Sequence, residues 1–87
     1  MYKIVIIDDN ELTRRSIAKT IKRRLPDCLV VGDASDGREG LSCIQSVCPD
    51  IIISDIKMPD LDGLSMVRIV QSALPATQII FITGYQD

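Results

Sequence analysis

Four short apolar runs constrain the fold of this chain more than any other feature of its sequence. They cover residues 4–7, 28–31, 51–54 and 78–82. The runs are rich in isoleucine and valine, which favour extended structure, and they lack the strict polar–apolar alternation of a half-exposed strand. Runs of this kind predict strands that are buried on both faces, as in a parallel sheet covered by helices.

Three segments between the runs carry apolar residues at helical spacing and are bounded by capping residues, glycines and prolines. The predicted helices run from Asn10 to about Arg24 before Leu25-Pro26, from Asp36-Gly37 up to Pro49, and from Gly63 to about Ala73 before Pro75. The predicted inward positions are Ile17, Ala18, Ile21 and Leu25, then Leu41, Ile44 and Val47, and finally Leu64, Val67, Val70 and Leu74. This alternation predicts an α/β fold, a doubly wound parallel sheet with right-handed crossovers.

The length and charge of the chain exclude several classes of protein. Its 87 residues allow one small domain with a modest core. No apolar run approaches the roughly 20 residues that span a membrane, and residues 1–3 lead into the first strand without a signal-peptide pattern. A net charge of −2 gives no general affinity for nucleic acid. We therefore expect a cytoplasmic protein that contacts neither membrane nor nucleic acid through this segment.

The cysteines do not form a recognisable metal or disulfide pattern. Cys28, Cys43 and Cys48 are odd in number and contain no C-x-x-C spacing. The chain has no histidine, which excludes zinc sites of the Cys/His kind as well as histidine-based catalysis. We interpret the three cysteines as reduced, partly buried thiols.

Aspartates follow two of the predicted strands at the point where each strand ends. Asp8 and Asp9 come directly after the first run, and Asp55 follows the third. The carboxyl ends of parallel strands meet at one edge of a sheet, where ligands bind in open α/β folds. Three carboxylates at this edge would repel one another unless a cation lies between them. Because Mg²⁺ prefers a few carboxylates together with water and phosphate oxygens, the pattern predicts a magnesium site.

The loops at the same edge exclude other ligand sites. Pro59 and Gly63 stiffen and turn the loop of residues 55–63, which is not an EF-hand because its first ligand would be Met58 and no glutamate closes it. No glycine-rich phosphate loop follows the first strand, so dinucleotide and flavin binding are disfavoured. The Gly37-x-x-Gly40 spacing is interpreted as two glycines at a helix start.

Thr83 ends the fourth strand at this edge, where its hydroxyl could donate to a phosphoryl oxygen. Together with Asp8-Asp9 and the loop Asp55-x-x-Met58-Pro59-x-x-x-Gly63, the Thr83-Gly84 pair resembles the receiver domain of two-component response regulators. The resemblance covers the whole chain, residues 1–87, in the same order and spacing. It implies a flavodoxin-like fold with strand order 2-1-3-4-5.

The resemblance also implies a role for each site residue. Asp55 would accept a phosphoryl group from a sensor histidine kinase or phosphotransfer protein. Asp9 would bind Mg²⁺ directly, Asp8 mainly through water, and the backbone carbonyl of Lys57 would complete the protein ligands. Thr83 would bind the phosphoryl group and reorient on activation. Such a domain assists its own phosphorylation without being a turnover enzyme, and it switches an output, here expected to be transcriptional regulation.

The family pattern continues beyond the end of this sequence, with a fifth strand that ends in a lysine and two further helices. Lys57 lies in the wrong loop to replace that lysine. We therefore expect the strand order 2-1-3-4, in a receiver domain that is incomplete at its C-terminus or completed by another copy. The apolar strand at residues 79–82 would then form an open edge that favours self-association.

Two further interpretations remain open at this stage. The first predicted helix has a basic face, which is either a solvated surface or a docking surface for a kinase; it comprises Arg14, Arg15, Lys19, Lys22, Arg23 and Arg24. The chain could also be a pseudo-receiver that binds partners without being phosphorylated. A magnesium-dependent phosphatase is disfavoured, because that class resembles Asp-x-Asp after the first strand, whereas Asp8 and Asp9 are adjacent.

Overall fold

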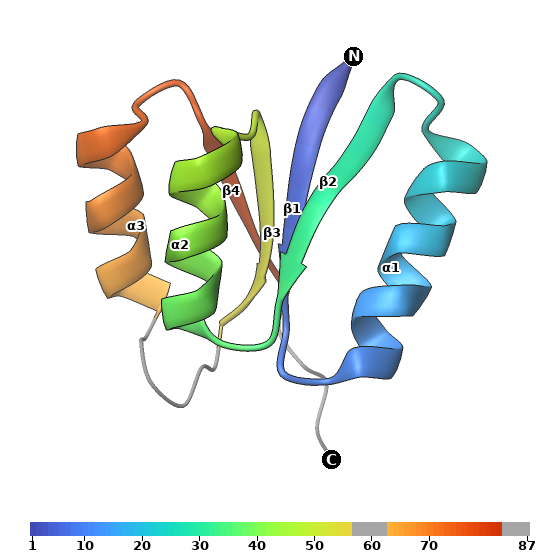
Figure 1. Ribbon diagram of the computed structural model, residues 1–87, viewed down its shortest axis with the longest axis horizontal. Coiled ribbons are helices and arrows are strands. Elements are labelled where there is room, and N and C mark those ends of the chain that lie inside the picture. The colour runs from blue at the N-terminus through green and yellow to red at the C-terminus, as the bar shows by residue number, and fades with distance from the viewer. Residues whose placement is uncertain (57–62, 83–87) are drawn as a thin grey trace.

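Strands and helices alternate along the chain in the predicted order (Figure 1). The structure is a computed structural model, which describes residues 1–56 and 63–82. Its elements are β1 (Tyr2–Ile7), α1 (Glu11–Arg24), β2 (Cys28–Ala34), α2 (Gly37–Val47), β3 (Ile51–Asp55), α3 (Gly63–Ala73) and β4 (Gln78–Ile82). Each predicted element is present, and the main difference in bounds is that β2 continues to Ala34 instead of ending at Val31.

The strands form one parallel sheet in the order β2-β1-β3-β4, which confirms the doubly wound, flavodoxin-like arrangement. β1 pairs with β3 from Ile4 opposite Ile51 to Ile7 opposite Ser54. The pairing of β1 with β2 contains one irregularity, because the register shifts between Ile4 and Val5. Since all strands run the same way, their carboxyl ends share one edge, at the bottom of Figure 1.

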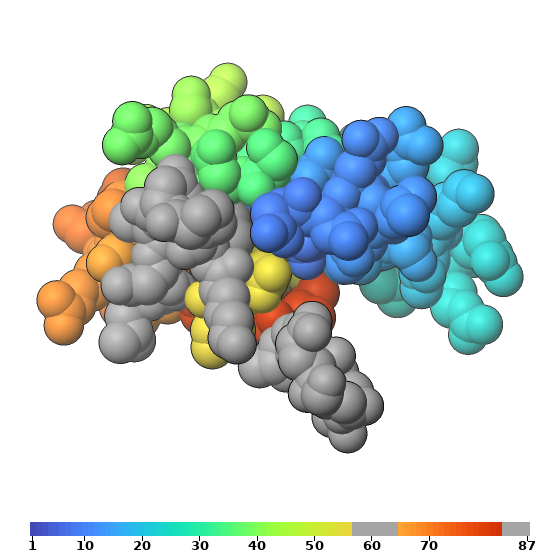
Figure 2. All heavy atoms as spheres, turned by 90° about the horizontal axis from the view of Figure 1, so that it is seen from below, coloured from blue at the N-terminus to red at the C-terminus, as the bar shows by residue number. Residues whose placement is uncertain are grey.

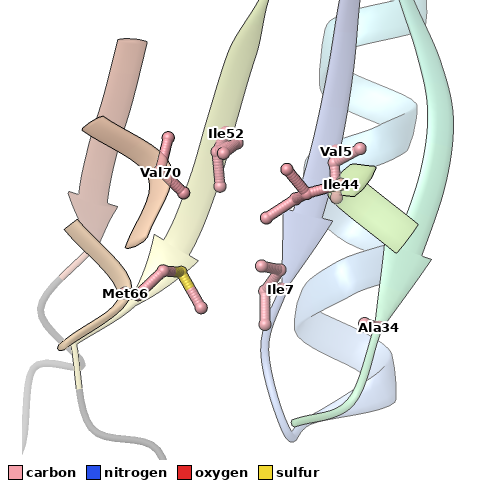
Figure 3. Packing of buried hydrophobic residues seen from close by; sticks show 7 residues of the cluster. All are labelled: Val5, Ile7, Ala34, Ile44, Ile52, Met66 and Val70. Atoms are coloured by element: carbon pink, nitrogen blue, oxygen red, sulfur yellow. The ribbon is translucent and has the colours of Figure 1, made fainter. Parts of the chain in front are cut away.

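Helices cover both faces of the sheet, as the alternation of β1 side chains requires. Val5 and Ile7 point toward α2 and α3, and the close-up of this layer shows them beside Ile44 of α2 (Figure 3). Ile4 and Ile6 point to the opposite face, where they pack with Ile21 of α1. The first of these cores consists of Val5, Ile7, Ala34, Ile44, Ile52, Met66 and Val70.

The helix ends form as the capping residues predict. The Asn10 side chain accepts a hydrogen bond from the backbone N–H of Thr13 at 3.0 Å, and Asp36 accepts one from Glu39 at 2.7 Å. These bonds satisfy N–H groups that have no partner inside their own helix. Cys48 ends α2 with a left-handed backbone, φ 47°.

Two predicted inward positions need correction. Leu25 is 48% exposed, because it lies beyond the last residue of α1; its backbone N–H donates to the carbonyl of Ile21, and its own carbonyl accepts from the N–H of Cys28. In α3 the core is entered by Met66 together with Val70, whereas Val67 is only partly buried. The prediction for Leu64 lies outside the side chains that the structure describes.

Gly40 has a packing role that the interpretation as a helix start missed. A Cβ atom at this position would lie 2.6 Å from Cδ1 of Ile7, so the absence of a side chain lets α2 approach β1 closely. The three cysteines are free thiols; Cys28 and Cys43 are partly buried, and Cys48 is exposed. Within the described ranges, none of the helices has the length and apolar character needed to cross a membrane.

The face of the sheet that α1 covers is not covered evenly. α1 packs on β1 and β2, and Figure 1 shows it at the β2 side of the sheet. Ile80 of β4 pairs with Ile53 of β3, so its side chain lies on this same face, and it is 52% exposed. Among the described residues, β4 pairs with β3 on one side and with no strand on the other.

Candidate functional site

Three aspartates converge at the carboxyl ends of β1 and β3. Ile7 pairs with Ser54, so the next residues, Asp8 and Asp55, leave adjacent strands at the same level. Asp8, Asp9 and Asp55 can each offer a carboxylate oxygen such that all three atoms lie within 4.8 Å of one another. The structure thus brings together the three side chains that the strand-end argument places at one edge. Their roles toward a metal or a phosphoryl group stay predictions.

Figure 2 views this edge from below. The end of β3, in yellow, lies beside the residues that follow β1, in blue. Asp9 is exposed and Asp55 is partly exposed, whereas Asp8 is only 7% exposed. The cluster is therefore accessible from solvent through Asp9 and Asp55 and is backed by Asp8.

Asp8 is held by three different parts of the chain. Its carboxylate accepts a hydrogen bond from the backbone N–H of Asn10 at 2.8 Å. Its own backbone N–H donates to the carbonyl of Ala34 at the end of β2, at 3.1 Å. Its carbonyl accepts a hydrogen bond from Nη1 of Arg14, at 2.6 Å. The carboxylate consequently projects from a backbone that has little freedom to turn.

The electrostatic surroundings of Asp8 suit a cation. Burial raises the pKa of the Asp8 carboxyl above its usual value, the hydrogen bond from Asn10 opposes this, and the charges of Asp55 and Asp9 raise it further. The ionised cluster is thus destabilised by desolvation and mutual repulsion. A hard divalent cation with oxygen ligands would relieve both effects, and these residues therefore fit Mg²⁺.

β3 presents Asp55 from a well-anchored strand end. Ser54, which is buried, donates its hydroxyl hydrogen to the carbonyl of Asp55 at 3.0 Å. The N–H of Ile56 donates to the carbonyl of Ile82 at 3.3 Å, which joins the ends of β3 and β4. Asp55 therefore combines a fixed backbone with a side chain that an external group can reach.

Several of the predicted site residues lie in the parts of the chain that the structure does not describe. Lys57, whose backbone carbonyl was predicted to bind the metal, and Thr83, predicted to bind the phosphoryl group, lie outside the described residues. The same holds for Met58 and Pro59 of the family motif.

Arg14 does not belong to the exposed basic face of the first helix, where its position in the sequence places it. Its side chain is 15% exposed; besides the Asp8 carbonyl, it contacts Asp33, with Nε 3.1 Å from a carboxylate oxygen. The other five cations of that face are exposed, as either interpretation of it requires. The only sequence signal for Arg14 is its place one turn after Asn10, close to the strand ends.

Comparisons with known proteins agree with this arrangement. The response regulator receiver domain, as a family, matches residues 4–87. The transcriptional regulatory protein LiaR of Bacillus subtilis is 33% identical over 87 residues, which are 100% of this chain and 41% of LiaR. Protein-glutamate methylesterase/protein-glutamine glutaminase 3 of Geobacter sulfurreducens is 35% identical over 98% of this chain and 23% of its own length.

A solved structure shows the same fold. The signal receiver domain of the putative response regulator NarL from Mycobacterium tuberculosis superposes with a TM-score of 0.88, at 28% identity, covering 99% of this chain and 68% of that chain. The chain spans less than half the length of the two curated relatives. From the match to residues 4–87, the strand order and the converging aspartates, we conclude that the chain belongs to the family of response regulator receiver domains.

Proposed function

We propose that this chain is a phosphorelay receiver, which accepts a phosphoryl group on Asp55 from a sensor histidine kinase or a phosphotransfer protein. The observation that carries the proposal is the convergence of Asp8, Asp9 and Asp55 within 4.8 Å at the sheet edge. The fit of this cluster to Mg²⁺ and the membership of the family support it.

In this proposal each residue has a distinct task. Asp9, the exposed member of the cluster, binds Mg²⁺ directly, and Asp8, the buried member, acts mainly through water. Asp55 contributes an oxygen to the metal and is also the acceptor. The Lys57 carbonyl as a ligand and Thr83 as the phosphoryl-binding hydroxyl are proposed from the family resemblance alone.

The transfer itself is a displacement at phosphorus. A carboxylate oxygen of Asp55 forms a bond to phosphorus while the bond from phosphorus to the donor's imidazole nitrogen breaks, and that nitrogen keeps the electron pair. When bound, Mg²⁺ supplies the positive charge that reduces repulsion between the carboxylate and the anionic phosphoryl group. Hydrogen bonds anchor the backbone at the end of β3, which carries the attacking side chain, and positioning contributes a large part of catalysis in such transfers.

Phosphorylation would act as a switch because it adds negative charge and acceptor oxygens at one accessible point. We propose that residues 1–87 form the receiver domain of a cytoplasmic regulator whose output is transcriptional regulation. The likeness to LiaR, a transcriptional regulatory protein, supports this choice of output. The chain itself would be a phosphoacceptor and not a turnover enzyme.

A direct test is phosphorylation with a small donor such as acetyl phosphate in the presence of Mg²⁺, followed by intact mass measurement. The unmodified sequence should gain one phosphoryl group, and Asp55→Asn should gain none. Asp27→Asn is the matched control, because Asp27 is exposed and precedes β2, at the opposite edge of the sheet. If the unmodified chain gains no phosphoryl group, the receiver proposal fails and the binding-only pseudo-receiver takes its place.

A further inference from the structure

Arg14 connects three elements beside the aspartate cluster. It lies in α1, its Nη1 donates to the carbonyl of Asp8 after β1 at 2.6 Å, and its Nε lies 3.1 Å from Oδ2 of Asp33 in β2. The guanidinium is well suited to this because it offers several N–H donors in a fixed planar arrangement. One side chain therefore joins the helix to the ends of two strands.

The carbonyl that Arg14 holds belongs to the peptide unit between Asp8 and Asp9. Because a peptide unit is planar, fixing its oxygen also fixes the N–H of Asp9 and limits rotation about the bonds on both sides. Those bonds determine where the Asp8 and Asp9 side chains start. The carboxylate of Asp8 is further restrained by the N–H of Asn10, at 2.8 Å.

We propose that Arg14, anchored by Asp33, is a positioning residue for the metal site: it holds the Asp8–Asp9 peptide unit so that both carboxylates face the cation. This inference rests on the proposed function, since it takes Asp8 and Asp9 as ligands of Mg²⁺. Arg14 touches neither the metal nor the phosphoryl group in this scheme. It acts only through the backbone that carries the ligands.

Arg15 provides a matched control within the same helix turn. It carries the same charge, but its side chain is 71% exposed, and its ion pair at 2.8 Å is with Glu11 of α1 itself. Replacing Arg15 therefore removes one positive charge near the site without releasing the Asp8 carbonyl. Removing a positive charge would by itself strengthen the binding of a cation, whereas the loss of positioning would weaken it, and only Arg14 contacts the Asp8 carbonyl.

The test is a titration of the 87-residue chain with Mg²⁺, followed by the amide and carbonyl NMR shifts of Asp8 and Asp9. Groups that orient metal ligands typically change metal affinity by about 10–100-fold when lost, and for a ligand held through its peptide we expect about 5–10-fold weaker binding in Arg14→Ala. Arg15→Ala should change the affinity less than about twofold. Before metal is added, the Asp8 carbonyl shift should move in Arg14→Ala and stay in place in Arg15→Ala.

Two further variants keep the test decisive if Arg14→Ala does not fold. Arg14→Lys keeps the charge and most of the stem but lacks the planar donors that contact Asp8 and Asp33 together, so it should also weaken Mg²⁺ binding. Asp33→Ala removes the anchor and should give a smaller loss in the same direction.

The outcomes separate the two proposals. If the unmodified chain binds no Mg²⁺, the proposed function itself fails. If it binds Mg²⁺ and the Arg14 variants that fold bind as tightly as Arg15→Ala, only the positioning role of Arg14 is overturned.

Discussion

On the β1–β2 side of the sheet, helices cover both faces. Within the described residues, β4 at the other side of the sheet has a helix over one face only. The difference is visible residue by residue. Residues 4–7 of β1 are all between 0% and 2% exposed, while Ile80 of β4 is 52% exposed. Asp8 and Asp9 leave the well-covered strand, and Asp55 leaves β3, which borders the less-covered one. The cluster thus lies between a strand that is buried on both faces and a strand that borders the more exposed β4.

The largest expected difference between the halves is in unfolding. Ile6→Ala should lower the free energy of unfolding by about 2–5 kcal/mol, because it opens a cavity beneath α1. Ile80→Ala should cost less than about 1 kcal/mol, because half of that side chain is already in water. Urea unfolding of both variants measures the two values. Equal losses would show that the β4 face is as well packed as β1.

The next effect concerns association. Ile80 of β4 is 52% exposed, and among residues 1–56 and 63–82 β4 pairs with a strand on one side only, so this part of the sheet should lead to self-association at high protein concentration. Ile80→Asp should weaken the association by about 10–100-fold, because burying an unpaired carboxylate in the interface removes it from water at a cost in free energy. Sedimentation over a wide concentration range tests this, with Glu11→Gln as a control on the covered side. A chain that stays monomeric throughout contradicts the prediction.

A smaller loss of stability should follow from Gly40→Ala, which changes only the packing of α2 on β1. The added Cβ would meet three atoms of Ile7 at 2.6, 3.1 and 3.3 Å, and Ile7 is itself confined by the core. Overpacking of about 1–3 kcal/mol should outweigh the helix preference of alanine, roughly 1 kcal/mol over glycine. Chemical unfolding gives the net loss. Ser46→Ala, at an exposed position of α2, should be close to neutral.

The smallest expected effect is a gain in stability, in the variant Asp8→Asn. Burial, together with the charges of Asp55 and Asp9, raises the pKa of Asp8 in the folded chain above 3.8. Folding therefore favours the protonated form, so the stability linked to this group is present at low pH and is lost as pH rises through the folded pKa. At pH 7 without metal, the free energy of unfolding of Asp8→Asn should be about 1 kcal/mol higher than that of the unmodified chain. The reason is that like charges about 5 Å apart repel by on the order of 1–3 kcal/mol.

Unfolding of Asp8→Asn and the unmodified chain at pH 3 and pH 7 in a chelator checks this sign. The two proteins should be alike at pH 3, where both side chains are neutral. Added Mg²⁺ should stabilise the unmodified chain more than the variant. A variant that is less stable at pH 7 without metal would mean that Asp8 is held in its ionised form by contacts stronger than the repulsion.

Much of the fold could be predicted because its signals are local. Asn10 and Asp36 cap their helices through their own side chains, and prolines follow the helix ends. The convergence of Asp8 and Asp55 follows from parallel strand direction alone. These features need no knowledge of which surfaces touch.

The features that were missed depend on contacts between distant segments. The rotation of α3, which buries Met66 rather than Val67, is set by the sheet beneath it and not by the helix's own pattern. β2 continues past Val31 because β1 offers it a pairing partner. In the sequence, Arg14 cannot be distinguished from the other five cations of the first helix. Its role becomes visible only from its contacts with Asp33 and the Asp8 carbonyl.

The register shift between β1 and β2 determines on which face of the sheet the Asp33 side chain lies. Val30 pairs with Ile4, but Gly32 pairs with Val5, so Val31 is an inserted residue in the ladder. Without that insertion Asp33 would lie opposite Ile7 and face α2. With it, Asp33 lies opposite Ile6, whose side chain faces α1, and there it meets Arg14. One additional residue in a strand thus reverses the direction of a carboxylate, which is a known use of bulges near functional sites.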